Sequence, residues 1–145
     1  GSDGWVYDVN ISSLEKVKVK KIHERALFDL QQIDESTFLS CGQNGQLFRW
    51  TYPLQAIEID TEIPAHVGAV YTIAFTKSKK YFATASRDKT IKIWETQTLL
   101  LQKVIDLKKY DWASKYSVNK VCWLSENLLV FGGDDMKIRV VRLTP

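Results

Sequence analysis

A serine, a histidine and an aspartate near the middle of the chain have the residue types of a nucleophilic triad. They are Ser86, His66 and Asp88. A hydrolase would use the histidine as the base that activates an exposed serine beside an oxyanion hole. The alternative is a structural set, in which the three polar side chains are buried and hydrogen-bonded to one another. The same residue types recur at regular intervals along the chain, and this recurrence favours the structural alternative.

The other residues that could bind a metal ion or a phosphate lack the required spacing. The two histidines, His23 and His66, are 43 positions apart, and Asp134-Asp135 has no further acidic residues at a calcium-loop spacing. Gly132-Gly133 is not followed by a helix that could form a phosphate-binding N-terminus. We therefore predict no catalytic residue, no metal site and no cofactor.

The composition is that of a single globular domain. Of 145 residues, 45% are hydrophobic and 26% are charged, and only 3 are proline, which excludes a disordered chain. No apolar run approaches the roughly 20 residues that span a bilayer, and the net charge of +3 is too small to argue for a nucleic-acid partner. Gly1-Ser2 resembles a cloning scar, and no signal peptide follows it, so we expect a cytoplasmic protein.

The two cysteines, Cys41 and Cys122, are 81 positions apart, and no Cys-x-x-Cys motif occurs. Both lie in apolar stretches of the chain. The favoured interpretation is a pair of buried, reduced thiols of the intracellular type. A disulfide between them is the alternative.

Short runs rich in β-branched and aromatic residues, separated by turn residues, predict an all-β chain. The run 85–94 is echoed at 41–50 and at 132–141, and a fourth copy begins at 3–9. Each copy has an Asp or Asn in a turn, followed by an extended run that ends at a large apolar residue. These turn residues are 41, 44 and 47 positions apart, at Asp3, Asn44, Asp88 and Asp135. An internal repeat of this length indicates a repeat architecture.

The residues Ala65-His66 and Ile91-Lys92-Ile93-Trp94-Glu95 resemble the repeat of the WD-repeat (WD40) β-propeller family, strongly over 64–105 and weakly elsewhere. The residues of these motifs are similar to those in the C-terminal half of a bacterial stand-alone WD-repeat propeller. The resemblance implies blades of four antiparallel strands, named a to d from the central channel outward. After the scar at 1–2, it divides the chain into a partial blade with strands c and d at 3–22, two whole blades at 23–63 and 64–107, and a partial blade with strands a to c at 108–145.

The resemblance also implies a role for the repeated polar residues. In this family a His before strand a, a Ser or Thr on strand b, an Asp in the b–c turn and a Trp on strand c form a buried hydrogen-bonded tetrad. The positions that match in the best repeat are His66, Ser86 (Thr84 in the alternative strand register), Asp88 and Trp94. A less complete set has Ser40 or Gly42 on strand b, together with His23, Asn44 and Trp50.

In propellers, the d–a loops and the b–c turns share one rim, which is the usual docking surface. In this chain the rim comprises 23–26, 43–45, 64–69, Arg87, Lys89, 108–117 and 134–136. We expect the partner-binding residues to be Arg25, Arg87, Lys89, Tyr110, Trp112, Tyr116, Asp134 and Met136. The segment 110–116 contains three aromatic residues, and aromatics are enriched at interface centres. The alternative is that Trp112 folds back and caps a neighbouring blade.

The predicted function is a non-catalytic scaffold for protein–protein interaction. One alternative is a small-ligand or enzymatic site at the mouth of the channel. Another is nucleic-acid binding through surface lysines, of which the alternating run Lys16–Lys21 is the main source. The other interpretation of this run is an outermost strand whose lysines block edge-to-edge pairing.

The predicted number of blades also suggests an interaction. Propellers close with 4–8 blades, and a WD-type blade takes about 40–45 residues. About three and a half blades are too few for a ring, so we expect another chain to complete it. Either a complementary half does so, or a head-to-tail homodimer forms in which the strand at 15–20 of one copy fills the last blade of its mate.

Overall fold

The computed structural model describes residues 2–52, 56–110 and 117–144, which form thirteen β-strands and one short 3₁₀ helix. All strand pairs are antiparallel, and the strands form four separate sheets. The predicted all-β class is therefore confirmed. Within the described ranges, no helix is long and apolar enough to cross a membrane, and the cytoplasmic location stays a prediction.

The strands of each sheet follow one another in sequence order. The first sheet is a hairpin of β1 (Trp5–Val9) and β2 (Lys16–Lys21). The second contains β3 (Leu27–Gln32), β4 (Thr37–Gly42), β5 (Gln46–Thr51) and β6 (Glu58–Pro64). The third contains β7 (Val70–Phe75), β8 (Tyr81–Ser86), β9 (Thr90–Glu95) and β10 (Leu101–Asp106), followed by the 3₁₀ helix η1 (Leu107–Lys109). The fourth contains β11 (Val118–Ser125), β12 (Leu128–Gly133) and β13 (Ile138–Arg142).

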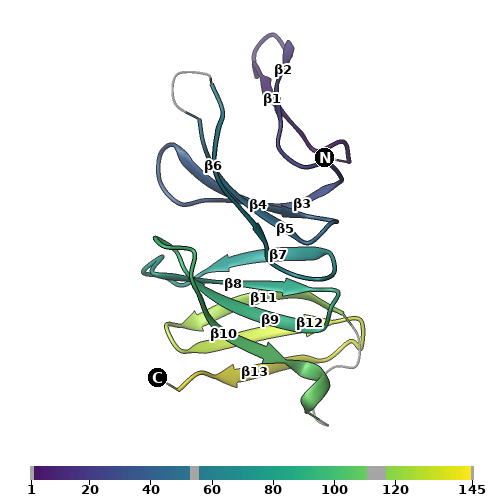
Figure 1. The fold of residues 1–145 in the computed structure, drawn as a ribbon, viewed down its shortest axis with the longest axis vertical. Coiled ribbons are helices and arrows are strands. Elements are labelled where there is room, and N and C mark those ends of the chain that lie inside the picture. The colour runs from purple at the N-terminus through teal and green to yellow at the C-terminus, as the bar shows by residue number, and fades with distance from the viewer. Residues whose placement is uncertain (1, 53–55, 111–116, 145) are drawn as a thin grey trace.

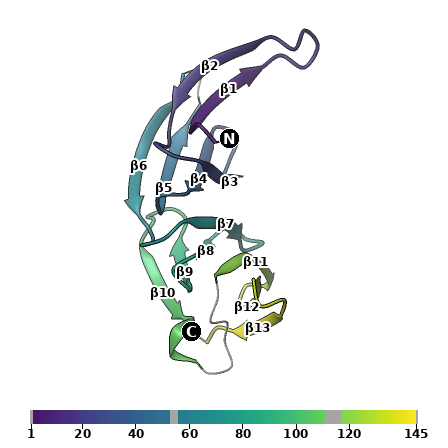
Figure 2. The same ribbon diagram turned by 90° about the vertical axis from the view of Figure 1, so that its right-hand side faces the viewer.

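The four sheets are stacked in chain order along the long axis of the molecule, with β1–β2 at one end and β11–β13 at the other (Figure 1). Figure 2 shows that the stack curves into an open arc, with β2, β6 and β10 on its outer side. The first strands of successive sheets are in contact, β3 with β7 and β7 with β11. This arrangement of blade-like sheets is that of a partial β-propeller. The residue limits that we assigned to the individual repeats stay predictions.

The core of the protein lies between successive sheets rather than in one central volume. Alternating side chains of a strand point to opposite faces, so each whole sheet packs against two neighbours. The cluster between the second and third sheets includes Leu39, Leu47, Val70, Ile73 and Phe82. The clusters at the other two contacts include Val6, Val19, Phe48 and Trp50 on one side, and Ile91, Ile93, Val121 and Phe131 on the other.

A shared turn geometry explains why Asp or Asn recurs in the repeats. The residue after each of them has a positive φ, namely 75° at Gly4, 82° at Gly45, 67° at Lys89 and 61° at Met136. A left-handed residue at the end of a short hairpin loop matches the twist of the two strands. The carboxylate before it accepts the N–H two residues further on in three of the four turns, from Trp5, Thr90 and Lys137.

The prediction of two buried, reduced cysteines is right for Cys41 and wrong for the burial of Cys122. Both cysteines are free, so the disulfide alternative is wrong, and Cys41 is buried as expected. Cys122 is exposed, and its predicted burial is wrong. The neighbouring residues Val121 and Trp123 pack against the third sheet, and strand alternation turns Cys122 to the opposite face.

Candidate functional site

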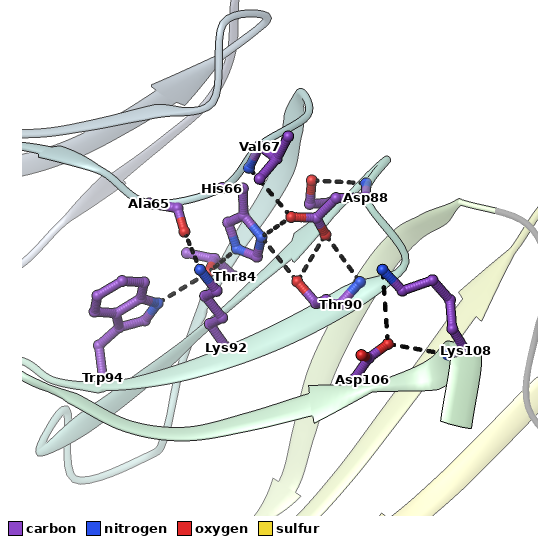
Figure 3. Close-up of polar contacts among 11 residues, drawn as sticks. Ala65, His66, Val67, Thr84, Asp88, Thr90, Lys92, Trp94, Asp106 and Lys108 are labelled. Carbon is purple, nitrogen blue, oxygen red and sulfur yellow. Dashed lines mark hydrogen bonds and ion pairs between the residues drawn. The ribbon is translucent and has the colours of Figure 1, made fainter. Parts of the chain in front are cut away.

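The predicted tetrad around His66 forms a buried hydrogen-bonded set in the third sheet (Figure 3). His66 Nδ1 lies 3.0 Å from Asp88 Oδ2, and His66 Nε2 lies 2.7 Å from Thr84 Oγ1. The indole N–H of Trp94 donates to the same Thr84 oxygen over 2.9 Å. The set connects the β6–β7 loop, strand β8, the β8–β9 turn and strand β9.

The assignment of Ser86 to this tetrad is wrong, and Thr84 occupies the position. Ser86 is buried, but its Oγ accepts the backbone N–H of Asp88 over 3.0 Å. Both residues lie on the same face of β8, because they are two positions apart in a strand. The sequence pattern alone leaves either of them open as the partner of His66. The path of the β6–β7 loop decides between them, since it places the ring over the residue farther from the turn.

The carboxylate of Asp88 is saturated with donors. Its Oδ2 faces the His66 ring and accepts the Val67 N–H over 3.3 Å. Its Oδ1 accepts the Thr90 N–H over 2.9 Å and the Thr90 hydroxyl over 2.6 Å. Burial acts to raise the pKa of Asp88, but the hydrogen bonds from Thr90 and His66 outweigh burial and hold it below its usual value.

The protonation of His66 follows from its surroundings. Burial lowers the pKa of His66, and the attraction of Asp88 offsets this only in part, so the ring is neutral at pH 7. Its single proton lies on Nδ1 facing the carboxylate, and Nε2 accepts the Thr84 hydroxyl. The Thr84 oxygen is fully buried and also receives the Trp94 indole. This network therefore contains no exposed nucleophile, and the geometry is that of a structural set.

The second sheet contains a less complete version of the same set. His23 Nε2 lies 2.8 Å from Ser40 Oγ, which also accepts the Trp50 indole N–H over 3.2 Å. The assignment of Asn44 is wrong, because this residue is exposed and His23 Nδ1 has no hydrogen-bond partner in the described part of the chain. Gly42 is not a polar partner either; a Cβ there would lie 2.3 Å from the Ala26 carbonyl oxygen. Burial lowers the pKa of His23 to about 4.

The fourth sheet uses a different pair at the same turn. Asp135 forms an ion pair with Arg139, with 2.7 Å between the Arg139 Nη1 and Asp135 Oδ2 atoms. Arg139 occupies the position that Lys92 has in the third sheet, where the Lys92 ammonium donates to the Ala65 carbonyl over 2.6 Å. Asp135, in the β12–β13 turn, therefore pairs with a cation of the strand that follows, β13, rather than with a histidine.

Two contributors to the His66 network escaped sequence reasoning, Thr90 and Lys92. Both lie on β9 on the same face as Trp94, because the three residues are spaced by two. This spacing of two residues is the signal in the sequence that could have placed Thr90 and Lys92 beside Trp94.

The rim residues are presented from the loops and turns at one end of the sheets. Arg25, Arg87 and Asp134 are exposed, Lys89 is half-buried and Met136 is 95% exposed. Tyr110 is exposed, whereas Trp112 and Tyr116 lie outside the described residues.

One member of the predicted set, Arg87, lies beside a hollow of about 420 Å³ between two neighbouring turns. It is lined by Gln43, Val67, Gly68, Ala69, Arg87 and Asp88.

The lysines of β2 make contacts within their own hairpin. The Lys16 ammonium lies 4.3 Å from the centroid of the Tyr7 ring, and the Lys18 ammonium lies 4.4 Å from that of Trp5. Each aromatic ring thus receives a cation from the neighbouring strand. These contacts favour the protective edge strand over a stripe for an anionic ligand.

No group of three or more His, Cys, Asp or Glu side chains that could hold a metal ion occurs in the part of the chain that the structure describes.

Comparison with known proteins identifies the repeat. Residues 58–95 match the WD40 family model, described as WD domain, G-beta repeat. The chain is 31% identical to the protein HIR1 of Mycosarcoma maydis over 100 residues, which are 68% of this chain and 10% of HIR1. It is 26% identical to the ribosome biogenesis protein YTM1 of Lodderomyces elongisporus over 83 residues, which are 57% of this chain and 16% of YTM1. The chain therefore spans a small part of the length of these curated relatives.

Two solved structures have the same fold as this chain. The computationally designed Ika4 protein has a TM-score of 0.74 at 20% identity, covering 99% of this chain and 82% of Ika4. The designed Ika8 protein has a TM-score of 0.75 at 20% identity, covering 98% of this chain and 41% of Ika8. At this identity, the similarity shows the fold alone.

The fold and the histidine networks define the class of protein as a β-propeller built from four-stranded blades. Within this class, the family match and the relatives show that the chain belongs to the WD-repeat family. The predicted family is thus confirmed. The similarity to a bacterial stand-alone member stays a prediction.

Proposed function

We propose that the chain is a non-catalytic scaffold that binds a partner protein on its rim. The main observation is the contrast between the two kinds of polar residue at the β8–β9 turn. Ser86, Asp88 and Thr90 are engaged in internal hydrogen bonds, whereas Arg87 between them is exposed. The turn is thus a fixed support for outward side chains rather than a reactive centre.

The support beneath the rim is rigid. The Arg87 N–H donates to the Ala69 carbonyl over 2.9 Å, which ties the turn to the start of β7. A Cβ at Gly68 would lie only 3.2 Å from the Asp88 nitrogen and 3.3 Å from the Arg87 Cβ, so loop and turn pack closely. Val67, next to this contact, is 98% exposed. A preorganised surface of this kind binds a partner with little loss of conformational entropy.

The proposal agrees with the names of the relatives. One is called a ribosome biogenesis protein, and a further one, human WDR6, is called a tRNA (34-2'-O)-methyltransferase regulator; it is 32% identical over 71 residues, 45% of this chain and 6% of WDR6. Regulation and assembly of larger complexes are tasks for a protein-binding surface.

The test removes apolar side chains from the rim without changing its charge. In the variant Val67→Asn, Met136→Asn, two exposed residues of the rim become polar, and Asn tolerates the positive φ at 136. The control Ile11→Asn, Leu14→Asn changes two other exposed apolar residues, in the β1–β2 turn. Proteins captured from a cell extract by the wild type and the control, but not by the rim variant, would support the proposal. Equal capture by the two variants would contradict it.

The second part of the proposal is that another chain, either a complementary half or a second copy, completes the ring. Its support is the face of the fourth sheet that points away from the third sheet. On this face, Ile138 is 80% exposed and Val140 is 56% exposed. The matching residues of the third sheet, Ile91 and Ile93, are buried in the cluster that includes β11 and β12 side chains. A further sheet would cover the exposed pair in the same way.

Light scattering of the purified protein tests ring completion. The homodimer version predicts twice the chain mass for the wild type and the single mass for Ile138→Lys, Val140→Lys. The control Leu101→Lys, Val104→Lys, at exposed residues of the outer strand β10, should keep the wild-type mass. A stable, cooperatively folded monomer would contradict completion by either kind of chain.

A further inference from the structure

The rim contains cations that form no ion pair among the described residues. Arg25 belongs to the β2–β3 loop, Arg87 and Lys89 belong to the β8–β9 turn, and no described carboxylate pairs with any of the three. Lys108 and Lys109 of η1 extend the cationic region. Of these five cations, Lys108 alone forms an ion pair with a described carboxylate, Asp106 at 4.0 Å.

The nearby carboxylates are already engaged. Glu24 pairs with Lys21 over 2.9 Å, and Asp135 pairs with Arg139. Asp134 is exposed, and it accepts a hydrogen bond from the Asn119 amide. Asp88 adjoins Arg87 in sequence, but its two oxygens receive donors from His66, Val67 and Thr90. The positive side chains at 87 and 89 are therefore free to meet charges from outside.

The hollow beside Arg87 selects a different kind of group. Its lining residues include the apolar Val67 and Ala69 and the acidic Asp88. A second carboxylate inside the hollow would be repelled by Asp88, whereas an uncharged apolar side chain would lie against Val67 and Ala69. An acidic residue on either side of that apolar side chain would reach the exposed Arg87 and the half-buried Lys89.

An aromatic pair lies on the first strands of the second and third sheets, β3 and β7. Tyr71 is two positions beyond Ala69 on β7, and its ring stacks on that of Phe28 with 5.6 Å between the centroids. Phe28 is 44% exposed. A second apolar residue of a bound segment would find a contact surface there.

From this combination of cations that form no ion pair among the described residues, a hollow that contains Val67 and Ala69, and an aromatic pair on the inner strands, we infer that the rim binds an acidic segment of a partner protein, in which carboxylates flank apolar side chains. This inference rests on the proposed function, because it names the partner chemistry of the same surface. Opposite charge across an interface favours encounter and excludes partners of the wrong charge.

The test measures binding of fluorescent synthetic peptides by anisotropy. The first probe is a twelve-residue peptide that alternates pairs of Glu with single Leu residues, and the second has Lys in place of every Glu. We expect binding of the acidic peptide only. The variant Arg87→Gln, Lys89→Gln should weaken it about threefold to tenfold. The control Lys77→Gln, Lys80→Gln removes two exposed charges from the β7–β8 turn, away from the rim, and should leave the affinity unchanged.

Two further probes define which outcomes overturn the inference. A peptide of Glu and Ser only should bind more weakly than the Glu–Leu peptide, because it has no group for the hollow. Single-stranded RNA of similar charge should not compete with the Glu–Leu peptide; effective competition would show recognition of polyanions in general and would overturn the inference. Equal losses in the 87/89 and 77/80 variants, or binding of the basic peptide, would also overturn it.

The two proposals fail in distinguishable ways. Loss of captured proteins in Val67→Asn, Met136→Asn, combined with no preference between the peptides, would leave the rim as a docking surface and refute only its acidic partner. Capture that is insensitive to the rim variant would refute the docking function itself.

Discussion

Replacement of Asp88 by Ala tests the structural role of the tetrad most directly. The substitution removes the acceptor of the His66 Nδ1–H and of the Val67 and Thr90 backbone N–H groups. The His66 side chain is fully buried. Its Nδ1–H keeps only the Thr90 hydroxyl oxygen, 3.0 Å away, and that buried hydroxyl loses Asp88 as its own acceptor. The β8–β9 turn also loses the side chain that holds its left-handed residue, Lys89.

The cost follows from the burial of the orphaned group. A buried donor left without an acceptor costs about 1–3 kcal/mol, so we expect the free energy of unfolding to fall by that amount. For a chain of this length, about 1 kcal/mol corresponds to about 2–4 °C in melting temperature. The variant should therefore melt about 2–12 °C below the wild type.

The second sheet offers a matched control at the equivalent turn position. Asn44 is exposed, and His23 Nδ1 has no hydrogen-bond partner among the described residues. Asn44→Ala should therefore change stability by less than about 0.5 kcal/mol. Urea and thermal unfolding of both variants, followed by circular dichroism, measure the difference. Equal effects at Asp88 and Asn44 would refute the reasoning, because they would show that burial of the network does not decide the cost.

Three further predictions use the same networks. Thr84→Val should destabilise the protein by about 1–3 kcal/mol, and more than Ser86→Val in matched urea unfolding, since Thr84 alone bonds both ring systems. Gly45→Ala should lower the melting temperature, because φ is +82° and the new Cβ would meet the His66 carbonyl oxygen at 2.1 Å; an unchanged melt would contradict the turn geometry. Because burial lowers the pKa of His23 from 6.5 to about 4, the unfolded state binds its proton first, so stability should fall as pH drops from about 6.5 to about 4, and His23→Gln should flatten this part of the stability–pH curve.

Much of the fold could be predicted because its determinants are local. The Asp or Asn before each left-handed turn residue, and the short β-branched runs around it, are visible in the sequence as a repeat. The assignment of His66, Asp88 and Trp94 to one network followed from the resemblance to the WD-repeat family, at positions that the repeat marks. A turn that needs a side-chain acceptor and a left-handed residue restricts the residue types wherever it occurs.

The errors occurred where a choice depended on the position of another element. Thr84 and Ser86 share a face of β8, and only the loop that carries His66 selects between them. Asn44 has the expected type at the expected turn, yet it is exposed and does not meet His23. Cys122 is in an apolar run, but it lies on the outer face of its sheet.

The sequence by itself determined the all-β class, the positions of the turns and the family resemblance, because short-range sterics and strand periodicity depend on neighbouring residues alone. Only the tertiary structure decided which hydroxyl completes the tetrad, which carboxylates are saturated, and which cations of the rim form no ion pair with a described carboxylate. Those properties depend on distances between residues of different strands and loops, and these distances arise only when the sheets pack.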